Sequence, residues 1–307
     1  SIKQGERFAL VGESGSGKTT LAMGVLRLIR PPGRIMGGSA LLYGTDLTKL
    51  TDEEMRERRL VDIALVPQGA MNSLNPVMRI SPQIIDGIVD HVPSNEDSPT
   101  GDELNARMSE LLIRVGLSPS VGRLFPHELS GGMKQRVAMA IAISLSPRVI
   151  IADEPTSALD VIVQRQIMQT LGQLQEGLDA TVLLVGHDMG LVAQFADTVG
   201  VMYAGELVEV APVATMFSNP VHAYPQLLID SIPNMDERKP LVGIPGLQPS
   251  LLNLPEGDVF APRSPIPHTP EEAAIRPTFV EIESGHWVQL SRSSVEDFDK
   301  YKHLVDY

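Results

Sequence analysis

One short stretch near the start of the chain constrains its fold more than any other. Residues 12–19 read Gly-Glu-Ser-Gly-Ser-Gly-Lys-Thr and fit the pattern G-x-x-x-x-G-K-[ST] in full. The apolar run 8–11 before it is typical of a short buried strand, and residues 21–29 after it have the pattern of a helix. Glycines let several backbone N–H groups point at one anion, and a helix N-terminus adds partial positive charge there. The stretch therefore predicts a phosphate-binding loop between a strand and a helix.

Two side chains of this loop have different expected roles in nucleotide binding. We expect Lys18 to reach the β- and γ-phosphates and the Thr19 hydroxyl to hold Mg²⁺. A glycine-rich turn that binds nothing is the alternative, and both flanking elements argue against it. The predicted nucleotide-binding residues are Gly12, Glu13, Ser14, Gly15, Ser16, Gly17, Lys18, Thr19 and Thr20.

Composition narrows the class of protein. The 307 residues are enough for a full core and two units, and their net charge of -13 argues against sequence-independent nucleic-acid binding and against adsorption to anionic lipid. The chain has no cysteine, so it can form neither a disulfide nor a thiolate metal site. No apolar run approaches the roughly 18 residues of a membrane span.

The order of predicted elements favours an α/β fold with a mainly parallel sheet. The runs 63–66, 149–152 and 181–185 are apolar throughout, as in strands covered on both faces, and 161–178 reads as a crossover helix. A strand and turn at 38–44 indicate a small antiparallel β part, and further strands are expected at 199–203 and 206–210. Residues of about 69–147 are mostly helical in pattern. From Asn219 prolines recur, so we divide the chain into a nucleotide-binding domain, 1–218, and a loop-rich C-terminal extension, 219–307.

Two acids close the strand at 149–152. Ligands bind at the carboxyl edge of an open parallel sheet, where Asp153 can hold Mg²⁺ and Glu154 can orient or deprotonate an attacking water. An exposed acidic strand end is the alternative for this segment alone. Its coexistence with a phosphate-binding loop favours the catalytic interpretation.

A second anion site is suggested by Leu129, Ser130, Gly131, Gly132 and Met133. Ser130 is a good N-cap, and the two glycines expose backbone ahead of a helix expected to run to about Leu145. From the residues alone, an ordinary capped helix is the favoured explanation of this segment.

Taken in order, these motifs resemble the nucleotide-binding subunit of an ATP-binding-cassette (ABC) transporter, a P-loop NTPase. The resemblance covers about residues 1–218. It is carried by the phosphate-binding loop, Gln68, the signature 129–133, the acids Asp153 and Glu154, the loop 157–160 and His187.

The resemblance implies a role for each matching residue. Two such domains would pack head to tail around two ATP molecules, with Ser130 and Gly132 of one meeting the γ-phosphate held by Lys18 of the other. Asp160 would cross that interface. Glu154, His187 and Gln68 would be catalytic. The Mg²⁺ ligands would be Thr19, Gln68 and Asp153.

A narrower likeness lies in residues 70–76, 219–225, 244–246 and 260–263, which resemble the oligopeptide/dipeptide importer branch and its C-terminal extension. Many members of that branch have cysteines in the extension that are suited to an iron–sulfur cluster. The corresponding positions here are Asp258, Ser264 and Leu290, and without thiolates we expect no such cluster.

We therefore predict an ATPase subunit that binds and hydrolyses MgATP to drive import of oligopeptides or dipeptides. The implied partners are a second ATPase subunit (the same or a paralogue), two transmembrane permease subunits and an extracytoplasmic solute-binding protein, with no nucleic acid. The chain would lie at the cytoplasmic face of the cell membrane, and the surface that couples it to the permeases would include Met71, Leu74 and Pro76. An oligosaccharide importer of the same family, or less favourably a soluble cassette ATPase outside transport, remains open.

Adenine recognition has no evident residue in the sequence. The first core strand begins almost at once, and Tyr43, the nearest aromatic residue after the loop, sits on a different predicted strand. We expect the nucleotide to be held mainly through its phosphates and Mg²⁺, with ATP and GTP nearly equivalent.

Overall fold

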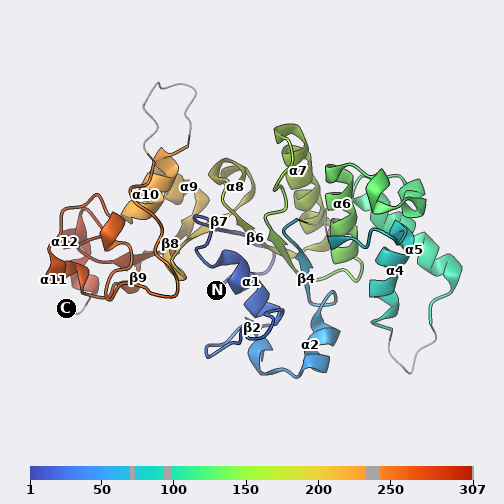
Figure 1. Cartoon of the computed structure of the whole chain (residues 1–307), viewed down its shortest axis with the longest axis horizontal. Helices are drawn as coiled ribbons and strands as arrows, with labels where there is room; N and C mark the ends of the chain where they lie inside the picture. The colour runs from blue at the N-terminus through green and yellow to red at the C-terminus, as the bar shows by residue number, and fades with distance from the viewer. Residues whose placement is uncertain (70–72, 93–97, 233–242, 306–307) are drawn as a thin grey trace. The chain divides into compact units, whose positions relative to one another are not determined.

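The computed structural model describes residues 1–69, 73–92, 98–232 and 243–305 (Figure 1). Within them the chain forms two compact units. The first unit combines Ser1–Glu6 with Thr19–Leu184, and the second combines Arg7–Lys18 with Val185–Tyr307.

The first unit contains a parallel pair of strands, of which β4 (Ile63–Val66) is the edge strand of the sheet. Strands β4 and β5 (Val149–Asp153) pair in parallel with Val66 opposite Ala152, and β6 (Thr181–Gly186) follows β5 in the order of the sheet. All three predicted strands are confirmed, and their side chains are mostly buried, as expected when both faces are covered. The remaining elements are β2 (Leu41–Leu42), β3 (Thr45–Asp46), α2 (Asp52–Arg58), α4 (Ile80–Val89), α5 (Gly101–Arg114), α6 (Gly131–Ala142), α7 (Val161–Leu178) and three short 3₁₀ turns.

Helix ends in this unit follow local capping chemistry. The predicted crossover helix is confirmed as α7, whose N-cap Asp160 accepts a hydrogen bond from the Val163 amide at 3.0 Å. The prediction that the first helix runs to residue 29 is wrong, because α1 (Lys18–Val25) ends earlier. Arg27 adopts a left-handed φ of 52°, and the Leu28 amide donates back to the Met23 carbonyl at 2.8 Å. That pattern satisfies the last carbonyls of a helix and stops it. Helix α6 likewise ends at Ala142, short of the predicted Leu145.

The second unit is built on its own run of strands. Here β1 (Arg7–Val11) pairs in parallel with β7 (Thr198–Tyr203), which pairs antiparallel with β8 (Glu206–Pro212). The strands expected at 199–203 and 206–210 are thus confirmed. The helices are α8 (Met189–Phe195), α9 (Val213–Ser218), α10 (Ala223–Asp230), α11 (Pro270–Ala273) and α12 (Phe298–Tyr301).

The C-terminal extension continues the strands of this unit. The hairpin β9 (Thr278–Glu283) and β10 (His286–Leu290) joins them because β10 pairs antiparallel with β8, with Trp287 opposite Val210. The extension also has its own apolar cluster, to which β10 contributes Val288 and Leu290. The other buried members of that cluster are Val221, Val295 and Phe298.

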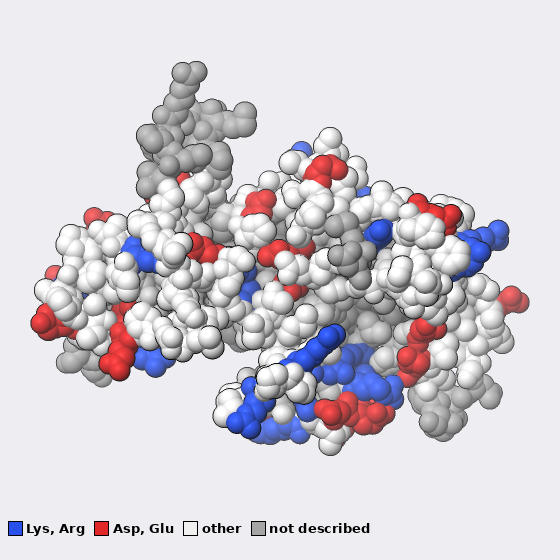
Figure 2. Space-filling view, viewed as in Figure 1, with Lys and Arg blue, Asp and Glu red and all other residues white. Residues whose placement is uncertain are grey.

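Charged side chains of both signs cover the surface around α2. Figure 2 shows blue and red groups side by side on the face that carries this helix. Arg56 pairs with Glu53 at 2.7 Å and Arg58 with Asp62 at 2.6 Å, so basic groups on this helix have acidic neighbours. A capping box at Thr51 starts the helix.

A buried polar cluster surrounds the carboxylate of Asp258. Its Oδ2 accepts hydrogen bonds from the hydroxyls of Ser291, Ser293 and Ser294. Burial raises the pKa of this carboxyl, but the three hydroxyls outweigh it, and the net pKa lies below the usual value. An ionised carboxylate with three donors thus occupies the core of the extension.

Close to this carboxylate lies a histidine that makes folding sensitive to pH. His222 is fully buried, and burial lowers its pKa although Asp258 and Glu209 oppose the effect. The unfolded chain therefore takes up a proton on this histidine below about pH 6.5, whereas the folded chain resists protonation. We expect the free energy of unfolding to fall as the pH is lowered from about 6.5.

Thermal unfolding measured between pH 8 and pH 5.5 checks this expectation. The variant His222→Gln should show a shallower loss of Tm on acidification, and His303→Gln, at an exposed histidine, should follow the wild type. Equal slopes for His222→Gln and the wild type would contradict the assignment.

Candidate active site

The phosphate-binding loop adopts a backbone that glycine alone tolerates at its first position. A Cβ atom on Gly12 would lie 2.1 Å from the Met202 carbonyl oxygen on β7, well inside contact distance. Gly15 and Gly17 have φ values of 87° and 99°, in the region that favours glycine. The loop therefore packs directly on strand β7 and turns sharply into α1.

Lys18 lies inside the loop rather than in solvent. The side chain is buried, and its Nζ donates to the carbonyl oxygens of Gly12 and Glu13, both at 2.8 Å, and to Ser16 Oγ at 3.2 Å. A phosphate that enters the loop could replace these neutral oxygens as the acceptor for Lys18 Nζ. The resulting hydrogen bond between the ammonium and the phosphate would be charge-assisted and therefore stronger. Lys18 therefore lies within the predicted phosphate-binding loop, and its contact with a phosphate stays a prediction.

Two of the three predicted Mg²⁺ ligands, Thr19 and Asp153, are brought together within the first unit, whereas Gln68 contacts Glu154. Thr19 Oγ1 donates to Asp153 Oδ1 at 3.1 Å, and Asp153 is fully buried at the carboxyl end of β5. Hydroxyl and carboxylate oxygens are the hard ligands that Mg²⁺ prefers. The residues present therefore fit this ion.

Strand register explains why Gln68 meets Glu154. Each residue lies two positions beyond the register pair Val66–Ala152 of the parallel strands β4 and β5. Gln68 Nε2 donates to Glu154 Oε2 at 2.8 Å. Glu154 has a left-handed φ of 43°, a costly conformation for a residue other than glycine that is common at active sites. The geometry holds the Glu154 carboxylate at the edge of the sheet, directly after Asp153, which accepts a hydrogen bond from Thr19.

The signature residues lie at the start of α6. Ser130 is exposed, and its Oγ accepts from the Met133 amide at 3.3 Å, which confirms the predicted N-cap. A Cβ atom on Gly132 would lie 2.7 Å from Val163 Cγ1 on α7. Gly132 therefore has a packing role inside its own unit, in addition to any role at a partner's nucleotide. Asp160, the predicted interface residue, is exposed and caps α7.

His187 and the predicted coupling residues differ in their exposure to solvent. His187 is exposed directly after β6 and belongs to the second unit, as do residues 12–18. Of the coupling residues, Leu74 is buried and Pro76 is exposed, whereas Met71 lies outside the described residues. Among the described residues, no helix has the length and apolarity that a membrane crossing needs.

Two residues at the loop escaped prediction from the sequence. Arg263 forms two hydrogen bonds with the Glu13 carboxylate, at 2.6 and 3.0 Å, and the Tyr224 hydroxyl accepts from the Glu13 amide at 2.9 Å. The run 260–263 was notable only for its resemblance to the importer extension. Nothing in its composition indicates a partner some 250 positions away.

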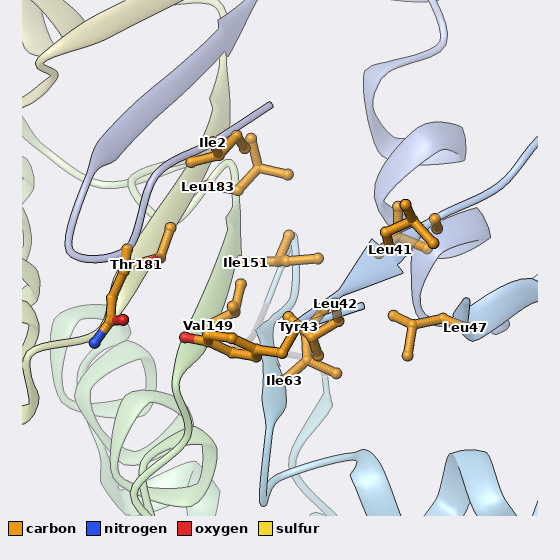
Figure 3. A pocket seen from close by; sticks show the side chains of 13 residues that line it. Ile2, Leu41, Leu42, Tyr43, Leu47, Ile63, Val149, Ile151, Thr181 and Leu183 are labelled. Carbon is orange, nitrogen blue, oxygen red and sulfur yellow. The ribbon is translucent and has the colours of Figure 1, made fainter. Parts of the chain in front are cut away.

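A separate apolar pocket of about 330 Å³ opens in the first unit (Figure 3). Leu42, Ile63 and Ile151 contribute to its wall. Tyr43 also lines it, from the turn after β2 rather than from a strand as predicted. The Arg148 guanidinium lies 5.0 Å from the centre of the Tyr43 ring, so this aromatic face already has a cationic neighbour.

Comparison with known proteins agrees with this geometry. The family model described as ABC transporter matches residues 1–157, and that described as oligopeptide/dipeptide transporter, C-terminal region, matches residues 208–268. The oligopeptide transport ATP-binding protein OppD of Bacillus subtilis (strain 168) is 41% identical over 268 residues, covering 86% of this chain and 74% of the relative. The dipeptide transport ATP-binding protein DppD of Lactococcus lactis subsp. cremoris (strain MG1363) is 41% identical over 266 residues, covering 86% and 75%.

A solved structure supports the same conclusion. The ATP-binding cassette MJ0796, in a dimeric post-hydrolysis state bound to ADP and Pi, matches with a TM-score of 0.61 and 30% identity over 69% of this chain and 88% of that one. The predicted P-loop NTPase fold is confirmed. The chain belongs to the ABC transporter family, in its oligopeptide/dipeptide branch, and is an ATP hydrolase of that family.

Proposed function

We propose that this chain hydrolyses MgATP to drive the import of oligopeptides or dipeptides through separate membrane subunits. The observation that carries the proposal is the pairing of Thr19 with Asp153 and of Gln68 with Glu154 at the carboxyl ends of two adjacent parallel strands. Ligands of open α/β sheets bind at this edge. The extension match and the names of the relatives support peptides as the solute.

Each residue has a distinct task in this proposal. The loop amides and Lys18 hold the β- and γ-phosphates, and Thr19 and Asp153 hold Mg²⁺, which when bound would neutralise charge on the phosphate oxygens. Glu154 accepts a proton from the attacking water, and Gln68 keeps that carboxylate oriented through its hydrogen bond. His187 contacts the γ-phosphate from the end of β6.

The signature residues complete the nucleotide site of a second ATPase subunit. Ser130 and the backbone N–H groups at the start of α6 would meet the partner's γ-phosphate, as a helix N-terminus favours an anion. Two permease subunits and a solute-binding protein would complete the importer, with this chain at the cytoplasmic face of the membrane. The dimeric state of the solved cassette supports only the pairing of two ATPase subunits.

The variant Ser130→Arg distinguishes the role of the signature at the partner's nucleotide from nucleotide binding by the subunit itself. We expect hydrolysis to fall by about 10²-fold, because the signature supplies donors to the partner's phosphate. The affinity of the isolated subunit for MgATP should stay near that of the wild type. Steady-state hydrolysis measures the expected loss of activity, and equilibrium nucleotide binding measures the expected retention of affinity.

The control is Ser120→Arg, at an exposed serine ten positions earlier, which should change neither quantity. Loss of nucleotide binding by monomeric Ser130→Arg would place the signature in its own subunit's site and overturn the head-to-tail arrangement.

A further inference from the structure

The phosphate-binding loop is held from outside by the C-terminal extension, and the contact centres on Glu13. This residue is the only acid among residues 12–19, where the anionic phosphates of ATP are proposed to bind. Its carboxylate faces Arg263 and its amide donates to the Tyr224 hydroxyl. Both partners lie in the extension and, like residues 12–18, in the second unit.

Arg263 is fixed for this contact by its surroundings. The side chain is only 4% exposed, against 29% for Glu13. Its Nε donates to the Pro245 carbonyl at 2.6 Å, and its guanidinium lies 5.7 Å from the centre of the Tyr203 ring on β7. The hydrogen bonds with Glu13 raise the pKa of Arg263 further, so the charge is permanent. The planar guanidinium meets the carboxylate with both of its terminal nitrogens, a geometry that lysine cannot reproduce.

Aromatic packing fixes the second contact. The rings of Tyr203, Tyr224 and Phe260 are fully buried and lie within 4.7 to 5.5 Å of one another. Tyr224 thereby presents its hydroxyl to the Glu13 amide from a rigid cluster that joins α10 to β7. Burial raises the pKa of Tyr224, so the hydroxyl stays neutral.

A third extension residue touches the same loop. Turned so that its amide is satisfied, the Gln248 side chain donates to the Ser14 carbonyl at 2.5 Å and accepts from the Ser16 amide at 3.2 Å. The extension thus contacts three consecutive parts of the loop: the side chain and amide of Glu13, the carbonyl of Ser14 and the amide of Ser16.

We propose that Arg263 is a positioning residue for nucleotide binding, which neutralises Glu13 and turns its carboxylate away from the phosphates. Tyr224 fixes the adjoining backbone. The inference rests on the assignment of residues 12–19 to the phosphates. The extension is therefore part of the nucleotide site of its own subunit. Without Arg263, the Glu13 carboxylate would be free to face the phosphates and repel them.

Equilibrium binding of MgATP to the full chain, at a temperature well below Tm, tests the proposal. We expect Arg263→Met to weaken binding about tenfold. A loss of this size results when only about a tenth of the molecules hold the loop in its binding conformation. In steady-state hydrolysis, Arg263→Met should raise KM for MgATP more than it lowers kcat. In the background of Glu13→Gln, the same substitution should weaken binding much less, because no carboxylate remains to be neutralised.

Arg276→Met is the matched control, since it removes an extension arginine that pairs with Glu206 on the surface. It should bind as the wild type does. Where Arg263→Met fails to fold, Arg263→Lys keeps the charge but loses the two-nitrogen contact, and it should show an intermediate loss that Glu13→Gln again reduces.

Lys18→Ala separates this inference from the site assignment. If Lys18→Ala binds MgATP normally, residues 12–19 do not hold the phosphates and both proposals fail. Should Lys18→Ala lose binding while Arg263→Met and Arg263→Lys retain it, the inference alone is overturned. An equal loss with and without the Glu13 carboxylate would also overturn it, because Arg263 would then act through the fold rather than through Glu13.

Discussion

Glu154→Gln should bind MgATP with nearly wild-type affinity and hydrolyse it about 10²–10⁴-fold more slowly, the range typical for loss of a general base. The amide keeps the shape of the side chain and can still hydrogen bond to Gln68, which lies 2.8 Å from the carboxylate. It cannot accept the proton of the attacking water. Phosphate release under saturating MgATP measures the loss, and equilibrium binding measures the retained affinity.

The matched control for this variant is Glu57→Gln, at an exposed glutamate on α2. It removes the same charge from the chain and should leave hydrolysis unchanged. Hydrolysis by Glu154→Gln within about twofold of the wild type would refute the assignment of Glu154 as the base, because a general base contributes far more than that.

Gly12→Ala should have the largest effect on the fold of the loop. The added Cβ would lie 2.1 Å from the Met202 carbonyl, and a backbone carbonyl on a central strand cannot move aside as a side-chain end can. Overpacking usually lowers the free energy of unfolding by about 1–3 kcal/mol. Because the overlap here is with backbone, we expect a loss at or above the upper end of that range. We expect a Tm lower by several degrees and loss of MgATP binding.

A second glycine provides the comparison. Gly177 on α7 has open space where a Cβ would lie, so Gly177→Ala should leave MgATP binding intact and keep or raise Tm, because alanine favours helix. Unchanged Tm and MgATP affinity in Gly12→Ala would show that the loop does not pack on β7 as described.

Local patterns were sufficient to predict the main elements and to propose most residues of the candidate site. The strand, glycine loop and helix at residues 8–25 form one continuous signal, and the acids after 149–152 follow from the position of strand ends in a parallel sheet. The crossover helix 161–178 was predicted with its observed bounds because it lies between two apolar strands, and in the structure Asp160 caps it and a left-handed Asp179 ends it. In these segments the residues that determine the local structure are neighbours in the sequence, so the pattern can be recognised without knowing the fold.

Contacts between distant segments were not predictable in this way. The pairing of Gln68 with Glu154 depends on the register of β4 against β5, which no single strand encodes. The contact of Arg263 with Glu13 joins residues 250 positions apart, and its buried arginine resembles any other basic residue in the sequence. Helix α10 was also missed, because its N-cap is His222 and a proline lies in its first turn.

Uptake by the assembled importer tests the central claim most directly. Membrane vesicles containing the permease and ATPase subunits, with the solute-binding protein and labelled solute on the opposite side from ATP, are compared with vesicles carrying Glu154→Gln. We predict ATP-dependent accumulation of a labelled oligopeptide or dipeptide with the wild-type chain, its near loss with Glu154→Gln, and no accumulation of an oligosaccharide. Peptide accumulation that persists with Glu154→Gln, or accumulation of the oligosaccharide in place of the peptide, would contradict the account.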